Sequence, residues 1–110
     1  MAIKLMKIIP SKRKGKKYVA YFLLDNGKEI ATHFGSKGMR DYVQINDKTS
    51  PFYIKKVKER EIVKDAYIRR HAKREDWNKF MTAGALSRWI LWSVPNLAGA
   101  IRNYKRKFSL

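Results

Sequence analysis

One ten-residue segment, AGALSRWILW at residues 83–92, constrains the fold more than any other part of the chain. It carries Trp89 and Trp92, two of the three tryptophans, in a protein whose formal net charge is +17. A disordered cationic chain lacks the apolar side chains needed to offset the conformational entropy lost on ordering. Here 45% of the residues are hydrophobic and 13% are aromatic. The segment therefore predicts a folded chain with a buried core.

Positive charge is spread over the whole chain. Lysines and arginines number 26 against 9 acidic residues, and the excess is +7 over residues 1–50 and +10 over residues 51–110. Self-repulsion of this size destabilises a compact protein unless its surface meets negative charge. The composition therefore predicts an acidic partner: a DNA or RNA phosphate backbone, an anionic membrane surface or an acidic protein.

The N-terminal third has the pattern of an antiparallel sheet. Residues 3–9 are rich in β-branched side chains, and a cationic turn separates them from an aromatic segment at residues 18–24. Asp25-Asn26-Gly27 then supplies residue types that tolerate the positive φ of a hairpin turn. We therefore predict a three-stranded antiparallel β-meander over about residues 3–34, followed by an irregular connector over residues 35–50.

A long basic helix is predicted to follow the connector. Ser50 and Pro51 have the form of an N-cap followed by proline at the first helical position, and helical spacing continues to Arg74. Some of its cations could alternatively be neutralised within the helix, by acidic residues such as Glu61 paired with Lys64.

Two further helices complete the predicted fold. Thr82 is a candidate N-cap for a helix that runs to Trp92. Residues 93–96 are expected to open the last helix, because apolar side chains then recur at helical intervals up to Phe108. The sequence thus predicts a single basic α+β domain over residues 1–110, with an N-terminal β-meander followed by about three α-helices over residues 51–108.

The cations are the candidate binding residues. Five of them lie within the six residues 12–17 around one glycine, others follow the third predicted strand, and a third group ends the long helix. Our hypothesis is that together they form a track that binds a phosphate backbone without reading its base sequence. The predicted polyanion-binding residues are Lys12, Arg13, Lys14, Lys16, Lys17, Lys37, Arg40, Arg69, Arg70, Lys73 and Arg74.

The aromatic residues are expected to form the core. Trp89, Leu91 and Trp92 are predicted to lie in the core or in a contact with another protein, since apolar residues surround that helix. Arg88 beside them is expected to pair with a carboxylate such as Asp76 or Asp41.

Tyr18, Tyr21 and Phe22 could alternatively form a base-stacking platform on the sheet. Strand alternation instead favours burial of one face of these rings under the helices.

Residue types for catalysis or metal binding are scarce. The chain has no cysteine and two histidines, His33 and His71, neither of which has a second ligand at a suitable spacing. No nucleophile elbow or phosphate loop is present. We therefore expect no catalytic residue, no metal site, no cofactor and no small-molecule substrate, so the protein is predicted not to be an enzyme.

Several segments together resemble a family of small basic proteins encoded by large nucleocytoplasmic DNA viruses, such as those that infect algae and amoebae. The resemblance runs nearly end to end, although residues 43–46 and 49–58 depart from the usual pattern. It is carried by Gly15-Lys16-Lys17-Tyr18, residues 33–42, Tyr67-Ile68-Arg69-Arg70-His71, Trp77, residues 83–92 and residues 103–108.

The resemblance implies a viral, non-enzymatic structural protein, located in the virion and in the host cytoplasm during assembly. Our first hypothesis is a minor capsid or virion component whose basic surfaces contact other virion proteins or anionic membrane. The alternative hypothesis is a sequence-independent nucleic-acid-binding protein that packages the genome.

Overall fold

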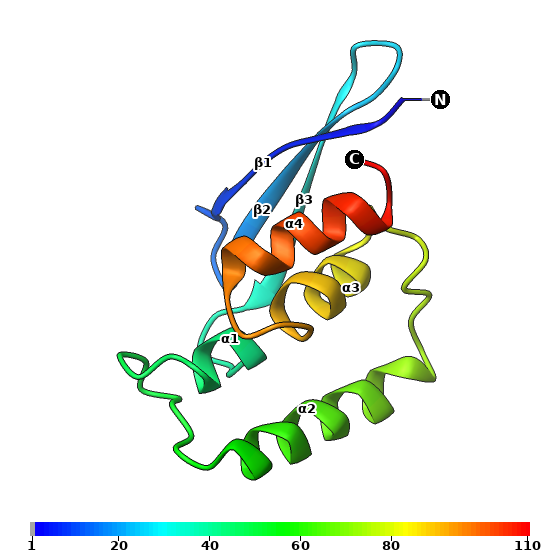
Figure 1. The fold of residues 1–110 in the computed structure, drawn as a ribbon. Coiled ribbons are helices and arrows are strands. Elements are labelled where there is room, and N and C mark those ends of the chain that lie inside the picture. The colour runs from blue at the N-terminus through cyan, green and yellow to red at the C-terminus, as the bar shows by residue number, and fades with distance from the viewer. Residues whose placement is uncertain (1) are drawn as a thin grey trace.

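The computed structural model describes residues 2–110, which form an antiparallel sheet followed by helices (Figure 1). The strands lie in the order β1-β2-β3, and η1 is a π-helical turn. The predicted α+β class with an N-terminal three-stranded meander is confirmed. The elements are β1 (Lys4–Pro10), β2 (Lys16–Leu23), β3 (Glu29–Ser36), α1 (Tyr42–Ile45), α2 (Val57–Ala72), α3 (Ala83–Leu86), η1 (Ser87–Leu91) and α4 (Leu97–Lys107).

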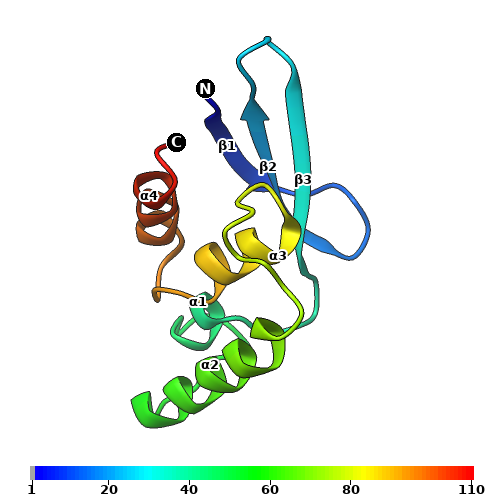
Figure 2. The same ribbon diagram turned by 90° about the vertical axis from the view of Figure 1, so that its right-hand side faces the viewer.

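The sheet has one aromatic face, and the helices cover it. Phe22 of β2 pairs with Leu5 of β1, and Tyr18 pairs with Phe34 of β3. Phe22 and Phe34 are fully buried in the core shared with the helices. Strand alternation places Tyr21 on the face opposite to that of Phe22, and the helices lie on one side of the sheet (Figure 2). Core packing, rather than a stacking platform, therefore accounts for Tyr18 and Phe22.

The α3–η1 segment and α4 supply the other half of this core. Ile90 and Tyr104 are almost completely buried, and the Tyr104 hydroxyl donates a hydrogen bond to the carbonyl of Phe80. Thr82 caps α3 as predicted, and the Asn96 side chain accepts from the N–H of Gly99 at 2.7 Å at the start of α4. Over residues 2–110, no helix combines the length and apolar character that crossing a bilayer requires.

Gly35 allows the end of β3 to pack directly on η1. Its φ is +79°, and a Cβ there would lie 2.9 Å from Cδ1 of Leu91 and 3.1 Å from Cβ of Lys17. Any side chain at this position would meet both the conformational penalty of positive φ and a steric clash. This close approach fixes the distance between the sheet and the helical layer.

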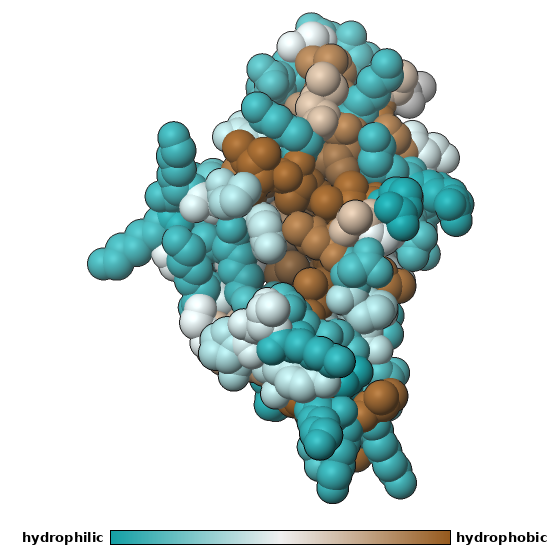
Figure 3. Space-filling view, turned by 60° about the vertical axis from the view of Figure 1, so that its left-hand side comes forward, coloured by the Kyte–Doolittle hydropathy of each residue, from teal (hydrophilic) through white to brown (hydrophobic). Residues whose placement is uncertain are grey.

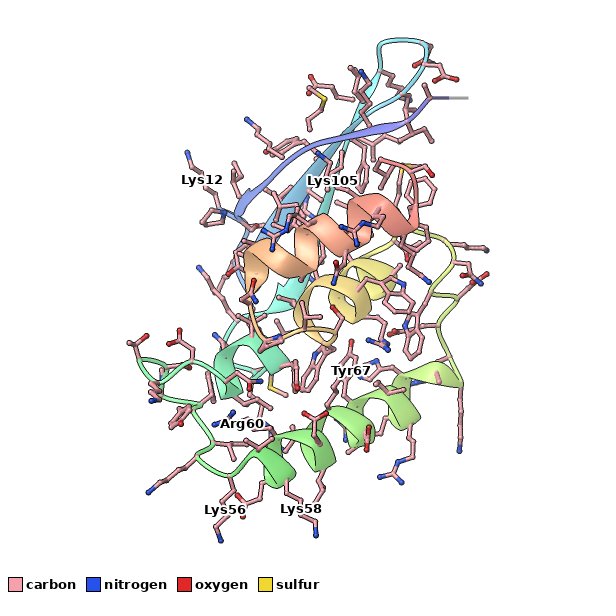
Figure 4. The ribbon with its side chains drawn as sticks, in the orientation of Figure 1. Lys12, Lys56, Lys58, Arg60, Tyr67 and Lys105 are labelled. Atoms are coloured by element: carbon pink, nitrogen blue, oxygen red, sulfur yellow. The ribbon has the colours of Figure 1, made fainter. Side chains whose placement is uncertain are left out.

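The long basic helix is shorter than predicted. α2 begins at Val57, and the N-cap predicted at Ser50-Pro51 is wrong, because Ser50 Oγ accepts from the N–H of Phe52 at 3.1 Å within a turn. The side chain of Arg60 instead reaches back and donates from Nε to the carbonyl of Ile54 at 2.6 Å (Figure 4). The N-terminal end of α2 is therefore held by the side chain of a residue inside the helix. N-cap sequence patterns do not include such a contact.

The tryptophan-rich segment, residues 83–92, contributes some side chains to the core and leaves others partly exposed. Leu91 and Trp92 are buried, at 3% and 6% exposure, whereas Trp89 is half-buried. The Trp89 ring contacts Trp77 edge-on at 6.4 Å between centroids. Arg88 lies over both of these rings, with its guanidinium carbon 4.4 Å from the Trp89 centroid and 5.3 Å from the Trp77 centroid.

The predicted pairing of Arg88 with a carboxylate is wrong. Arg88 donates from Nη1 to the carbonyl of Trp92 at 2.8 Å, while Asp41 is already paired with Lys17. Burial lowers the pKa of Arg88, which agrees with a guanidinium held between aromatic rings rather than beside a negative charge.

Candidate polyanion-binding site

The cationic turn between β1 and β2 is locally ordered. Ser11 is buried, and its Oγ accepts from the N–H of Arg13 at 3.0 Å and contacts Nδ1 of His33 at 2.7 Å. Gly15 has a φ of +80°, which closes the turn. Lys12, Arg13 and Lys14 are exposed on this turn, and Lys12 extends outward from it (Figure 4). The turn therefore presents a fixed group of cations.

The electrostatic effect of this turn is visible at His33. Desolvation lowers the pKa of His33, and the nearby charges of Arg13 and Lys16 lower it further. A protonated imidazole is disfavoured first by desolvation and then by the positive charges of the turn. The turn thus has the polarity that an anion requires.

The loop after β3 lies beside the cationic turn. The N–H of Lys37 donates to the carbonyl of Gly15 at 3.0 Å, which joins the two segments. Lys37 and Arg40 are exposed. The fold therefore brings together two groups of predicted binding residues that are separated by a complete hairpin in the sequence.

Lys17 is a correction to the predicted binding set. Its Nζ donates to Oδ2 of Asp41 at 2.6 Å, to the carbonyl of Met39 at 2.6 Å and to Oε1 of Gln44 at 3.1 Å. The side chains of Lys17 and Asp41 are only 9% and 3% exposed. All the donor capacity of this ammonium is used inside the protein, so Lys17 holds the loop in place and cannot bind an external anion.

The cations at the end of α2 are exposed. Arg69, Arg70, Lys73 and Arg74 lie on or just after its last turns. The alternative of neutralisation within the helix is wrong for Lys64, which donates from Nζ to the carbonyl of Ser93 at 2.6 Å.

The Glu61 carboxylate also has a different partner. It accepts from the hydroxyl of Tyr42 at 2.5 Å. Glu61 and Lys64 are therefore not paired with each other, and each attaches α2 to a neighbouring segment.

One aromatic stack anchors α2 to the rest of the molecule. Tyr67 is the buried residue of this helix, and Figure 4 shows it pointing toward the molecular body while Lys56 and Lys58 point away. Its ring stacks on Trp92 at 4.2 Å between centroids and on His71 at 4.1 Å. Both faces of the Tyr67 ring are therefore covered by other side chains.

Burial of Tyr67 predicts an alkaline loss of stability. Burial raises the pKa of Tyr67 to about 12, above its ordinary value near 10. Between these two pH values the unfolded chain loses the proton and the folded chain keeps it. The free energy of unfolding should then fall by up to about 1.4 kcal/mol per pH unit from this residue. Denaturant unfolding across pH 10 to 12 should show a shallower fall for Tyr67→Phe, and parallel pH profiles would contradict the assignment.

A cleft of about 460 Å³ lies between α2, the end of the sheet and the α3–η1 segment. Its lining includes Lys16 and Lys17 from β2, Arg40 from the loop after β3 and Arg70 from α2. We call this recess the cationic cleft. The remaining predicted binding residues, Lys12, Arg13, Lys14, Lys37, Arg69, Lys73 and Arg74, do not line it.

The two carboxylates that line the cationic cleft have hydrogen-bond partners within the protein. Asp41 is paired with Lys17. Glu75 accepts from Nε1 of Trp77 at 2.8 Å through one oxygen, and its other oxygen lies 2.9 Å from Nδ1 of His71. Lys16, Arg40 and Arg70 have no carboxylate within 4.0 Å among residues 2–110. The recess therefore has a positive balance.

Sequence reasoning did not identify the cationic cleft as a unit. Tyr67 and His71 are four residues apart on one face of α2, and Glu75 follows just after the end of that helix. Asp41 and Gln44 have the spacing of a capping box before α1, and the N–H of Gln44 donates to Asp41 Oδ1 at 2.8 Å. These signals locate each wall separately, but they do not show that the walls face each other.

Over residues 2–110 no group of three or more histidine or acidic side chains is placed to hold a metal ion. Figure 3 shows hydrophobic residues gathered in a band at the centre of one face, with hydrophilic residues around it. Large exposed hydrophobic residues include Met6 and Met39, at 53% and 63% exposure.

The comparisons with known proteins cover only part of the chain. Residues 6–50 match a family described as a family of unknown function (DUF5754). No curated protein and no solved structure matches the chain. The matched segment contains the cationic turn and one wall of the cationic cleft, with Lys16, Lys17 and Arg40, and it ends before α2.

Proposed function

We propose that this protein binds nucleic acid through the phosphate backbone, without reading the base sequence and without catalysing a reaction. One observation supports this proposal most strongly. Among residues 2–110, Lys17 is the only one of the 26 lysines and arginines that lies within 4.0 Å of a carboxylate. A surface with so little internal neutralisation needs external negative charge, and phosphate backbones supply it at the highest linear density.

Burial of the tryptophan-rich segment favours this proposal over a mainly protein-binding role. The capsid hypothesis relies on the helix around Trp89 and Trp92 and on the aromatic sheet for contacts with another protein. Trp92 and Phe22 are buried in the core of this chain, and Trp89 is half-buried. The exposed cations occur on the turn between β1 and β2, on the loop after β3 and at the end of α2, which favours the nucleic-acid alternative.

The relation to large DNA viruses stays a prediction. The description of the matching family names no function and no source. Location in the virion or in the host cytoplasm, and contacts with other virion proteins or membranes, therefore stay predictions as well. Fractionation of purified particles is the measurement that would test them.

A salt titration with duplex DNA of mixed sequence tests the proposal. Each phosphate neutralised by a lysine or arginine releases bound counterions, so the logarithm of the binding constant falls linearly with the logarithm of salt concentration. We expect a slope of about −4 or steeper, and the same affinity for unrelated sequences of equal length. A slope near zero, or weak binding at low salt, would overturn the proposal.

Substitutions in the cationic turn test whether its lysines and arginine contact phosphates. Replacing Lys12, Arg13 and Lys14 by serine should reduce the magnitude of the slope by about 0.9 for each phosphate that the turn no longer neutralises. Lys17 is left unchanged because it holds the loop after β3. The control replaces three scattered exposed cations by serine: Lys28, Lys79 and Arg102. Equal slopes for the two variants would show that the turn has no special role, and circular dichroism should show both variants folded.

A further inference from the structure

We propose that the cationic cleft holds one nucleotide unit of an unpaired nucleic-acid strand. The inference rests on the proposed function and narrows its ligand class from any phosphate backbone to single-stranded nucleic acid at this position. It starts from the presence of Arg40 and Arg70, from two different elements, in the lining of one recess of about 460 Å³. Such a volume lies in the range of sites that enclose small organic groups.

The charges in the cationic cleft suit a phosphate group. Four lysines and arginines line the recess (Lys16, Lys17, Arg40 and Arg70) against two carboxylates (Asp41 and Glu75), so the balance of charge is positive. Arg40 lines the cleft from the loop after β3, and Arg70 lines it from α2. A guanidinium can donate two hydrogen bonds to one phosphate, so arginines from two elements that line one recess suit a phosphate ligand.

The remaining walls suit an uncharged organic group rather than a bare ion. Val63 and Ala66 of α2 and Leu91 of η1 line the cleft beside the hydroxyl-bearing residues Ser36 and Ser87. An inorganic anion would leave these apolar walls without a partner, whereas the sugar and base of a nucleotide would cover them. The π-helical turn of η1 contributes both Ser87 and Leu91 to this wall, and such turns are frequent at functional sites.

The shape of the site favours an unpaired strand. A nucleotide in a duplex is stacked and paired, so it must be unstacked and unpaired before it can enter a recess, and this cost is lowest for a single strand. The Tyr67 ring is covered on both faces by Trp92 and His71, so it is not available to stack on a base. Binding should therefore depend on the phosphate and on apolar contact, with little preference among bases.

A pair of double variants tests the site. The cleft variant carries Arg40→Gln and Arg70→Gln, and the control carries Arg102→Gln and Arg106→Gln on the exposed side of α4, which gives the same net charge. The probes are an oligothymidylate and a mixed-sequence duplex of the same length. We expect the cleft variant to lose about tenfold or more in affinity for the oligothymidylate relative to the control. Both variants should bind the duplex with similar affinity.

The tryptophan indole signals in a proton–nitrogen NMR spectrum locate the contact. Trp92 lines the cationic cleft, whereas Trp77 and Trp89 do not. Addition of the oligothymidylate should shift the Trp92 indole signal more than the other two, with assignments taken from single Trp→Phe variants. A shift confined to Trp77 and Trp89 would overturn the proposal.

The outcomes separate this inference from the proposed function. If neither nucleic acid binds the unaltered protein, the proposed function fails and the inference fails with it. If both double variants weaken both probes equally, general phosphate binding stands and the cleft proposal is overturned. Thymidine monophosphate is the third probe. If the protein binds it as tightly as the oligothymidylate, the ligand is a free nucleotide and the single-strand assignment is overturned.

Discussion

Replacing Trp92 by alanine is expected to lower the free energy of unfolding by about 3–5 kcal/mol. The Trp92 ring is 6% exposed and stacks on Tyr67 at 4.2 Å, with an interplanar angle of 7°. Its removal would leave a cavity in the core. It would also leave Tyr67, the buried residue of α2, without the ring on which it stacks. Urea unfolding followed by circular dichroism measures the loss, and amide hydrogen exchange should show reduced protection across α2.

Two related variants serve as controls for this result. Trp89→Ala should cost less, about 1–2 kcal/mol, because Trp89 is half-buried and the substitution removes a hydrogen bond to the Trp77 carbonyl and the stacking of two cations on its ring. Trp92→Phe keeps an aromatic partner for Tyr67 and should retain α2 protection. Equal destabilisation by Trp89→Ala and Trp92→Ala, or unchanged exchange in α2, would contradict the proposed anchor.

Replacing Lys17 by methionine is expected to cost about 3–5 kcal/mol of folding free energy, because it leaves the Asp41 carboxylate buried without its ammonium partner. The same substitution removes the hydrogen bond to the Met39 carbonyl. The loop after β3 should then lose its fixed position, and Arg40 with it. Equilibrium unfolding in urea gives the size of the effect.

A second substitution separates charge burial from a general packing defect. Asp41→Asn in the Lys17→Met background removes the buried negative charge and keeps an oxygen that can accept from the Gln44 N–H at the start of α1. We expect this double variant to recover much of the stability that Lys17→Met removes. If it is no more stable than Lys17→Met, the buried carboxylate is not the source of the destabilisation.

The sheet could be predicted from local patterns because its registers and turns are encoded locally. The alternation of Tyr18, Ala20 and Phe22 selects one buried face, and Asp25-Asn26-Gly27 specifies a hairpin turn. The caps at Thr82 and Asn96 are equally local signals. The start of α2 could not be predicted in this way, since Arg60 stabilises it through contacts with the preceding loop.

The candidate site shows the same division. Composition identifies a cationic surface, but it treats Lys17 in the same way as Lys16. The two residues differ because strand alternation turns one toward Asp41 and leaves the other without a carboxylate partner among residues 2–110. Arg70 is 30 residues from Arg40 in the sequence. Packing of Tyr67 on Trp92, with the hydrogen bonds of Lys64 and Glu61, brings α2 beside the loop after β3.

The amino-acid sequence by itself determined the α+β class, the β-meander and the strong positive charge, because these follow from residue type and from spacing over a few residues. Tertiary structure decided which cations are available, where α2 lies and that a cleft exists between its side chains and the sheet. Those properties depend on contacts between residues far apart in the chain, such as Lys17 with Asp41 and Tyr67 with Trp92, and local patterns carry no information about such contacts.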